Sequence, residues 1–221
     1  GTIVPNQSVI ASFNMSISAS APIYSAVTFN YSVTSGSVSK FMNNIQSIAC
    51  VSNMSGTGSK SNPYLIRNLC DLQTMSKNLN LTTCYALVND IDALDTLDWN
   101  SGAGFMPIGN YTKPFCGKFD GRGYNISNLF INRPAPDYVG LFGRLASTGS
   151  VTNISLTNAS ITGRQNVGGI AGYSYGSVSR VSLLDVNITG EQNVGGIVGD
   201  SYGSVFNSSA TGKVSGSSSL I

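Results

Sequence analysis

Carboxylate side chains cluster in the first half of the chain and are the groups best suited to chemistry. Asp90, Asp92, Asp95 and Asp98 stand close together, and Asp120 is expected to stack near Asp90. Paired carboxylates can cleave glycosidic bonds, or hold calcium beside a basic partner, as a polysaccharide-acting enzyme on a β-helix would require. The alternative, which we favour, is that these aspartates sit in turns and accept hydrogen bonds from nearby backbone amides.

Other reactive groups give less support to catalysis. The chain has no histidine, so its serines lack the usual base and a His-Glu-x-x-His zinc site is impossible. We therefore expect no enzyme activity, no catalytic residue, no cofactor and no metal site. The four cysteines lack Cys-x-x-Cys spacing, and their even number fits disulfides with three possible connectivities, although buried free thiols are the alternative. The disulfide candidates are Cys50, Cys70, Cys84 and Cys116.

Asparagines supply the strongest indication of the cellular compartment. Of the 22 asparagines, 11 begin an Asn-x-Ser/Thr sequon, more than the serine and threonine content alone would give. The alternative is that asparagine occurs near serine and threonine because turns and exposed strands favour all three residue types. Glycans require surface positions in an exported protein, so we predict an extracellular, N-glycosylated chain delivered by the secretory pathway. The predicted sites are Asn6, Asn14, Asn30, Asn53, Asn80, Asn110, Asn125, Asn153, Asn158, Asn187 and Asn207.

Composition excludes two classes of partner. Charged residues make up 10% of the chain and the net charge is +2, with lysines and arginines scattered singly, so nucleic acid is not expected as a partner. The longest apolar stretches fall far short of the about 20 residues that span a bilayer, so we expect no membrane insertion. The chain begins at Gly1, without Met or an apolar signal region. We interpret it as a mature chain whose signal peptide has been removed; the alternative is a fragment of a longer protein.

An internal repeat is the most specific pattern in the sequence. Residues 165–172 (QNVGGIAG) recur as 192–199 (QNVGGIVG), and residues 174–178 (SYGSV) recur as 201–205, both at an offset of 27. A unit of this length cannot bury its apolar side alone and needs its neighbours. Its glycines and alternating apolar residues disfavour helices. The repeat therefore predicts an all-β chain, a right-handed parallel β-solenoid with coils of 26–28 residues.

Stacked coils place equivalent residues in columns about 4.8 Å apart. The offset predicts an inward column of Val151, Val178 and Val205, and it pairs Tyr175 with Tyr202. A third column, facing solvent, contains Asn153, Arg180 and Asn207. The tyrosine pair could bind glycans, although a simple packing ladder is the reading we favour.

The repeated segments VGGIAGY and VGGIVGD resemble the GLUG motif, which occurs in β-solenoid regions of filamentous-haemagglutinin-like adhesins and of some immunoglobulin-A-cleaving metallopeptidases. Upstream segments in the order typical of such solenoids extend the resemblance over residues 56–216. They include the sequences NPYLI at 62–66, YALVNDID at 85–92 and FCGKFDGRGYNISNL at 115–129. This resemblance implies a scaffold or stalk and carries no activity of its own.

Three regions are expected along the chain. Residues 1–48 form an N-terminal β-strand extension, residues 49–84 a cap with one short helix at 69–79, and residues 85–221 the repeat solenoid. Asn68 and Asp71 suit the start of that helix. The extension alternates apolar and polar residues in two strands, which cannot form a stable domain alone. We expect these strands to mediate assembly, with apolar residues Phe13, Met15, Ile17, Val27, Phe29 and Tyr31.

These observations predict a secreted, glycosylated structural protein. Its subunits would associate head to tail into a surface coat, fibre or appendage, with the N-terminal strands adding to an exposed strand of the next copy. The partners expected are therefore other copies of the chain and covalent N-glycans. The alternatives are a monomeric cell-surface adhesin that binds glycan or matrix, and the polysaccharide-acting enzyme.

Overall fold

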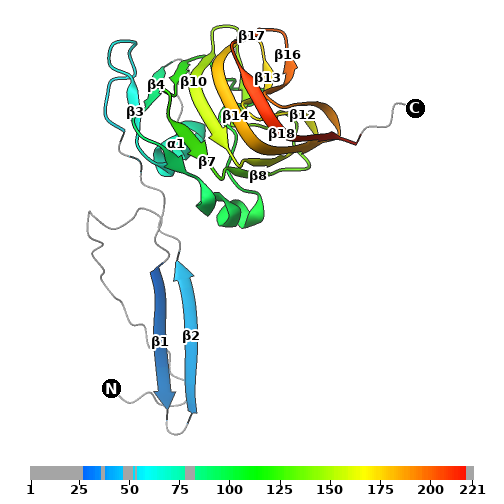
Figure 1. Ribbon diagram of the computed structural model, residues 1–221. Helices are drawn as coiled ribbons and strands as arrows, with labels where there is room; N and C mark the ends of the chain where they lie inside the picture. The colour runs from blue at the N-terminus through cyan, green and yellow to red at the C-terminus, as the bar shows by residue number, and fades with distance from the viewer. Residues whose placement is uncertain (1–26, 36–37, 47–51, 53, 78–82, 218–221) are drawn as a thin grey trace. The chain divides into compact units, whose positions relative to one another are not determined.

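The computed structural model divides the chain into two units, Gly1–Val51 and Ser52–Ile221, and describes residues 27–35, 38–46, 52, 54–77 and 83–217. In the first unit, β1 (Val27–Ser35) pairs antiparallel with β2 (Val38–Gln46), as Figure 1 shows. The expected assembly residues Val27, Phe29 and Tyr31 lie in β1. The expected strand around Phe13, Met15 and Ile17 lies outside the described residues. The pairing of β1 with β2 was not predicted from the alternation of apolar residues.

The second unit is a parallel β-solenoid, which confirms the predicted fold (Figure 1). Its largest sheet contains β3 (Tyr64–Ile66), β4 (Cys84–Leu87), β5 (Ile91–Asp92), β6 (Lys118–Asp120), β7 (Asn125–Ser127), β8 (Phe130–Asn132), β10 (Ser150–Thr157), β11 (Ser160–Thr162), β14 (Ser177–Gly190), β17 (Ser204–Phe206) and β18 (Ser209–Gly216). Strands β3, β4, β6, β10, β14 and β17 stack in chain order, and each pairs in parallel with the next. Each of these pairings joins successive coils.

Two smaller parallel sheets complete the later coils. One contains β9 (Phe142–Leu145), β13 (Ala171–Ser174) and β16 (Val198–Ser201), and the other contains β12 (Gln165–Gly168) and β15 (Gln192–Gly195). Val167 lies opposite Val194 and Ala171 opposite Val198, which reproduces the offset of 27 found in the sequence. The repeat is therefore one coil of the solenoid.

Apolar columns fill the interior of the solenoid. Val151 pairs with Val178 and Val178 with Val205, which confirms the predicted inward column. Val151 and Val178 are 0% exposed, as expected for a close-packed core. Below them, Phe142 contacts Phe115 and Phe119 with ring centroids 4.9 and 5.5 Å apart. The earlier coils thus replace valine with aromatic side chains.

A short helix lies beside the first strand of the stack. Helix α1 (Leu69–Lys77) covers most of the range predicted for it and contacts β3. The Asn68 side chain accepts a hydrogen bond from the Asp71 amide at 2.9 Å, and the Asp71 carboxylate accepts one from the Arg67 amide. These bonds satisfy amides at the helix start, as the sequence predicts. Leu69, Cys70, Leu72 and Met75 are buried.

A second short helix, η1 (Leu94–Gly102), is a 3₁₀ helix with a kink and was not predicted. Its Thr96 side chain is fully buried and accepts a hydrogen bond from the Phe130 amide, which fixes η1 against β8. Within the part of the chain that the structure describes, neither helix is long and apolar enough to cross a membrane.

Candidate functional site

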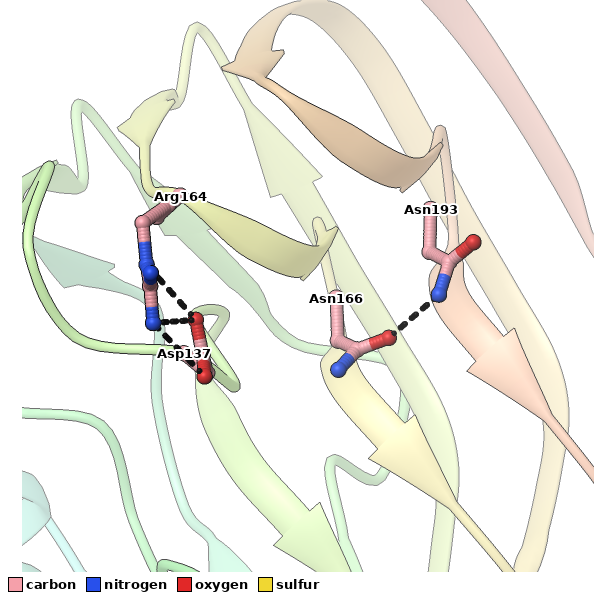
Figure 2. A network of polar contacts seen from close by, with 4 residues as sticks. All are labelled: Asp137, Arg164, Asn166 and Asn193. Carbon is pink, nitrogen blue, oxygen red and sulfur yellow. Dashed lines mark hydrogen bonds and ion pairs between the residues drawn. The ribbon is translucent and has the colours of Figure 1, made fainter. Parts of the chain in front are cut away.

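Left-handed residues form three columns at the corners of the coils. Asn166 and Asn193, one coil apart, have φ values of +55° and +52°, a conformation that asparagine tolerates better than most residues. Figure 2 shows the Asn193 side-chain amide donating a hydrogen bond to Asn166 across 2.8 Å. The columns are Arg122, Asn153, Arg180 and Asn207; Asn128, Asn158 and Asp185; and Tyr138, Asn166 and Asn193.

Several sequon asparagines occupy these corners or bond to neighbouring coils. The Asn153 amide donates to Asp120 at 3.1 Å while its oxygen accepts a hydrogen bond from Arg180, which confirms the predicted column. The side-chain amide of Asn158 donates to the side chain of Asn128, and the side-chain amide of Asn125 donates to the Thr157 hydroxyl. The abundance of sequons therefore partly reflects the preference of the corners for asparagine, which is the alternative to glycosylation.

The remaining sequons differ in their surroundings. Asn110 caps a turn, because its side-chain oxygen accepts hydrogen bonds from the amides of Thr112 and Lys113. Asn187 and Asn207 are exposed, and Asn30 lies in β1. Glycosylation of these asparagines stays a prediction. The sequons at Asn6, Asn14, Asn53 and Asn80 lie outside the described residues.

Three of the five aspartates that could have formed a catalytic pair, Asp90, Asp92 and Asp120, accept hydrogen bonds from neighbouring residues, whereas Asp95 and Asp98 are exposed in η1. Asp90 accepts a hydrogen bond from the backbone amide of Asn125. Asp92 accepts one from the Leu94 amide and one from the Asn128 side chain. Asp120 accepts one from the Arg122 amide. Among the described residues, no group of three or more histidine, cysteine or acidic side chains is arranged to hold a metal ion.

The cysteines fall into two kinds. Cys70 is fully buried in α1 and is disulfide-bonded. Cys84, in β4, and Cys116, just before β6, are half-buried free thiols. Cys50 lies outside the described residues. The prediction of Cys84 and Cys116 as disulfide candidates differs from the structure, in which both are free thiols, and the partner of Cys70 stays a prediction.

Five tyrosines form a continuous row on the outside of the solenoid, which we call the tyrosine face. The ring centroids of Tyr175 and Tyr202 are 5.5 Å apart, which confirms the predicted pair. Tyr173 lies 5.2 Å from Tyr175 and 5.6 Å from Tyr138, and Tyr138 stacks on Tyr111 at 6.1 Å. Sequence reasoning missed three of the five, although the two-residue step from Tyr173 to Tyr175 was a signal that both point to one side.

Arg144 lies against the tyrosine face. Its guanidinium carbon is 4.8 Å from the ring centroid of Tyr111 and 5.3 Å from that of Tyr173, within the range of cation–π attraction. One guanidinium nitrogen donates to the Tyr111 carbonyl, whereas the buried Nε atom has no hydrogen-bond partner among the residues that the structure describes. The Tyr173 hydroxyl donates to the Tyr175 oxygen at 3.1 Å, which raises the pKa of Tyr173 because it stabilises the protonated phenol.

The last coil that the structure describes has exposed apolar side chains. Val205 and Val214 continue the buried columns of Val178 and Ile188, yet they are 41% and 47% exposed, against 0% for the residues they follow. With Phe206, at 46% exposure, they belong to a surface that we call the open coil, residues 192–216. A hollow of about 460 Å³ opens on this surface between Val186, Ile197 and Val214.

Comparison with known proteins agrees with this architecture. Residues 190–215 match the family model of the GLUG motif, within the region where the sequence resembles it. The chain is 45% identical over 125 residues to a halomucin of Haloquadratum walsbyi, covering 54% of this chain and 1% of that protein. It is 42% identical over 107 residues to a candidate Gly-rich membrane protein of Evansella cellulosilytica, covering 48% of this chain and 12% of that protein.

A solved structure gives an independent comparison of the fold. A candidate immunoglobulin A1 protease from Bacteroides ovatus superposes with a TM-score of 0.52 and 24% identity, over 72% of this chain and 59% of that one. At this identity the likeness concerns the fold alone. The stacked coils and the motif match together identify the chain as a β-solenoid that carries the GLUG motif.

Proposed function

We propose that the chain is a structural protein of an extracellular surface, exported, N-glycosylated, and joined head to tail into a coat, fibre or appendage. The observation that carries the proposal is the open coil, where Val205, Phe206 and Val214 remain uncovered. The names of the relatives, a halomucin and a Gly-rich membrane protein, support a location at the cell surface.

The open coil has the properties of an acceptor for another β-strand. The outer side of β17 and β18 has no strand paired to it among the described residues, so its backbone amides and carbonyls can pair with an added chain. Covering the coil would also remove Val205, Phe206 and Val214 from water, which favours association by the hydrophobic effect. Natural proteins usually protect such edges, and the proposal assigns a strand of another copy to this one.

The N-terminal region supplies the donor strands in this proposal. β1 and β2 form a two-stranded hairpin, and an isolated hairpin is marginally stable in water. Addition to the open coil of another copy would extend the hairpin into a larger sheet. Because donor and acceptor are different surfaces of one chain, the same contact can repeat from copy to copy, and it produces a linear polymer where the rotation between copies does not close a ring.

Sedimentation velocity over a range of concentrations tests the proposal with two variants. One lacks residues 1–48, the predicted donor. The other carries Val205→Lys and Val214→Lys, which place charges on exposed positions of the acceptor and oppose strand addition. We expect the full chain to form species that grow with concentration, and both variants to sediment as monomers.

Leu184→Lys provides the matched control, because Leu184 is 50% exposed in β14 and lies outside the open coil. This variant should assemble like the unmodified chain. The proposal is wrong if the full chain remains monomeric, or if either variant assembles as well as the control.

We also propose that the chain has no catalytic role. The engagement of Asp90, Asp92 and Asp120 by backbone amides and corner asparagines supports this reading, because a general acid or base needs a carboxylate available to substrate. Incubation with a panel of polysaccharides, followed by assay for new chain ends, tests it. Turnover that depends on protein concentration would contradict the proposal.

A second candidate function is that of a monomeric adhesin, favoured by the tyrosine face. Electron microscopy of the native material separates the two functions, since ordered fibres support the structural role and dispersed particles support the adhesin. Head-to-tail assembly would leave most of the tyrosine face available to a ligand, because the open coil and the tyrosine face share only Tyr202.

A further inference from the structure

We propose that the tyrosine face and the cavity beside it bind an acidic polysaccharide, with sugar rings on the tyrosines and carboxylates at the cavity. The cavity has a volume of about 360 Å³, within the range of small-molecule sites. Tyr138 belongs to both features: it lines the cavity and contacts the rings of Tyr111 and Tyr173. The two features therefore form one continuous surface.

The cavity carries an excess of positive charge. Arg133 and Lys113 line it, together with one carboxylate, that of Asp137. Asp137 is already neutralised, because Arg164 binds it through two hydrogen bonds at 3.1 Å and an ion pair at 3.0 Å, as Figure 2 shows. Two cations therefore remain without a carboxylate within ion-pair distance among the described residues.

Arg133 is held in place to receive an anion. Its guanidinium donates to the carbonyl of Phe105 at 3.1 Å and to that of Gly104 at 3.4 Å. Burial lowers the pKa of Arg133, because removal from water disfavours the charged form. An arriving carboxylate would offset that desolvation and match the planar donors of the guanidinium.

The tyrosine face supplies the complementary surface for sugar rings. Tyr111 is 64% exposed, Tyr175 44% and Tyr202 68%, so aromatic surface is available to a ligand on three successive parts of the face. Ring faces are electron-rich and attract the polarised C–H groups of a pyranose ring, while the phenol hydroxyls can bond sugar hydroxyls. A row of rings, rather than one ring, fits a polymer better than a single sugar.

Charge also gives the face a direction. Arg144 contacts Tyr111, Tyr173 and Tyr175 near the cavity, whereas Asp200 lies opposite Tyr173 in the following coil. The cationic end is therefore the end beside Arg133 and Lys113. Acidic groups of the polysaccharide should lie at that end, and uncharged sugar units toward Tyr202.

Binding of matched polymers by isothermal titration calorimetry tests the proposal. The measurement uses the Val205→Lys/Val214→Lys chain, so that assembly of the protein does not contribute to the heat. The result therefore does not depend on whether the unmodified protein assembles head to tail. The probes are polygalacturonate and its fully methyl-esterified form, then dextran sulfate and dextran. We expect polygalacturonate to bind at least about ten-fold more tightly than its ester, which has the same rings without the charge. Stronger binding of dextran sulfate than of polygalacturonate would overturn the assignment to carboxylates.

Two exposed substitutions test the residues without disturbing the core. Tyr111→Ala should weaken polygalacturonate binding about ten-fold, and Lys113→Gln should weaken it and reduce its salt dependence. The matched controls are Phe206→Ala and Lys118→Gln, which remove an exposed ring and an exposed charge elsewhere. The proposal would be overturned if all four variants bind equally well. It would also be overturned if polygalacturonate and its methyl ester bind equally, or if neither polygalacturonate nor dextran sulfate binds.

Discussion

The side-chain amide of Asn193 donates a hydrogen bond to the side-chain oxygen of Asn166, its equivalent one coil earlier (Figure 2). Both residues are in the left-handed region, so one residue type satisfies the backbone corner and also links neighbouring coils. The same combination occurs at Asn158 and Asn128. Corner asparagines are therefore structural elements of this solenoid.

Substitution of Asn166 separates these two contributions. Asn166→Gly keeps the left-handed corner and removes the hydrogen bond, which should lower the free energy of unfolding by about 1 kcal/mol. Asn166→Ala also forces a Cβ-bearing residue without a polar side chain into that conformation, at a further cost of about 1–2 kcal/mol. Urea unfolding measures both. Equal values for the two variants would mean that the corner conformation does not determine the choice of asparagine.

Gly176 is required because coils approach closely at this position. A Cβ atom on Gly176 would lie 2.2 Å from the Gly149 carbonyl oxygen of the preceding coil. Gly176→Ala should therefore destabilise the chain by about 3 kcal/mol, the upper range for overpacking. In Gly216→Ala the added atom would be 3.8 Å from its nearest neighbour, so thermal unfolding should change little. A Gly176→Ala variant as stable as the unmodified chain would contradict the close approach of the two coils.

Sequons should differ in occupancy according to the freedom of their amide nitrogens. Asn187 is exposed in β14, whereas the Asn125 amide is half-buried and donates to Thr157 at 2.8 Å. A glycan attaches to this nitrogen, so in the exported protein we expect higher occupancy at Asn187 than at Asn125. Glycopeptide mass spectrometry measures both sites in one sample. An unmodified chain would refute the predicted glycosylation, and the reverse order would refute the structural argument.

Tyr173 should ionise at a higher pH than an ordinary phenol does. Its hydrogen bond to Tyr175 raises its pKa above the usual value of about 10, so the folded chain keeps a proton that the unfolded chain releases. Stability should therefore fall as pH rises above about 10. Tyr175→Phe removes the acceptor, and phenolate absorbance should then show Tyr173 ionising at lower pH. Tyr124→Phe, away from the face, should leave that transition in place.

The sequence predicted the solenoid because the offset of 27 was preserved where coils stack. The columns of Val178 and Tyr175 follow directly from it. Corner conformations could not be predicted in the same way, since an asparagine such as Asn153 gives the same sequence pattern as a glycosylation site. The tyrosine face was found only in part, because Tyr111 belongs to a loop outside the repeat and reaches Tyr138 through tertiary packing. The cavity beside it depends on similar contacts and left no local signal.

Hydrogen exchange of the open coil shows whether head-to-tail assembly covers β17 and β18. Amide exchange in β17 and β18 is measured for the full chain at low and high concentration, with β10 in the buried stack as the internal reference. We expect amides around Val205 and Val214 to become protected as assemblies form, while those of β10 do not change. Assemblies in which β17 and β18 exchange as fast as in the monomer would contradict the proposed assembly.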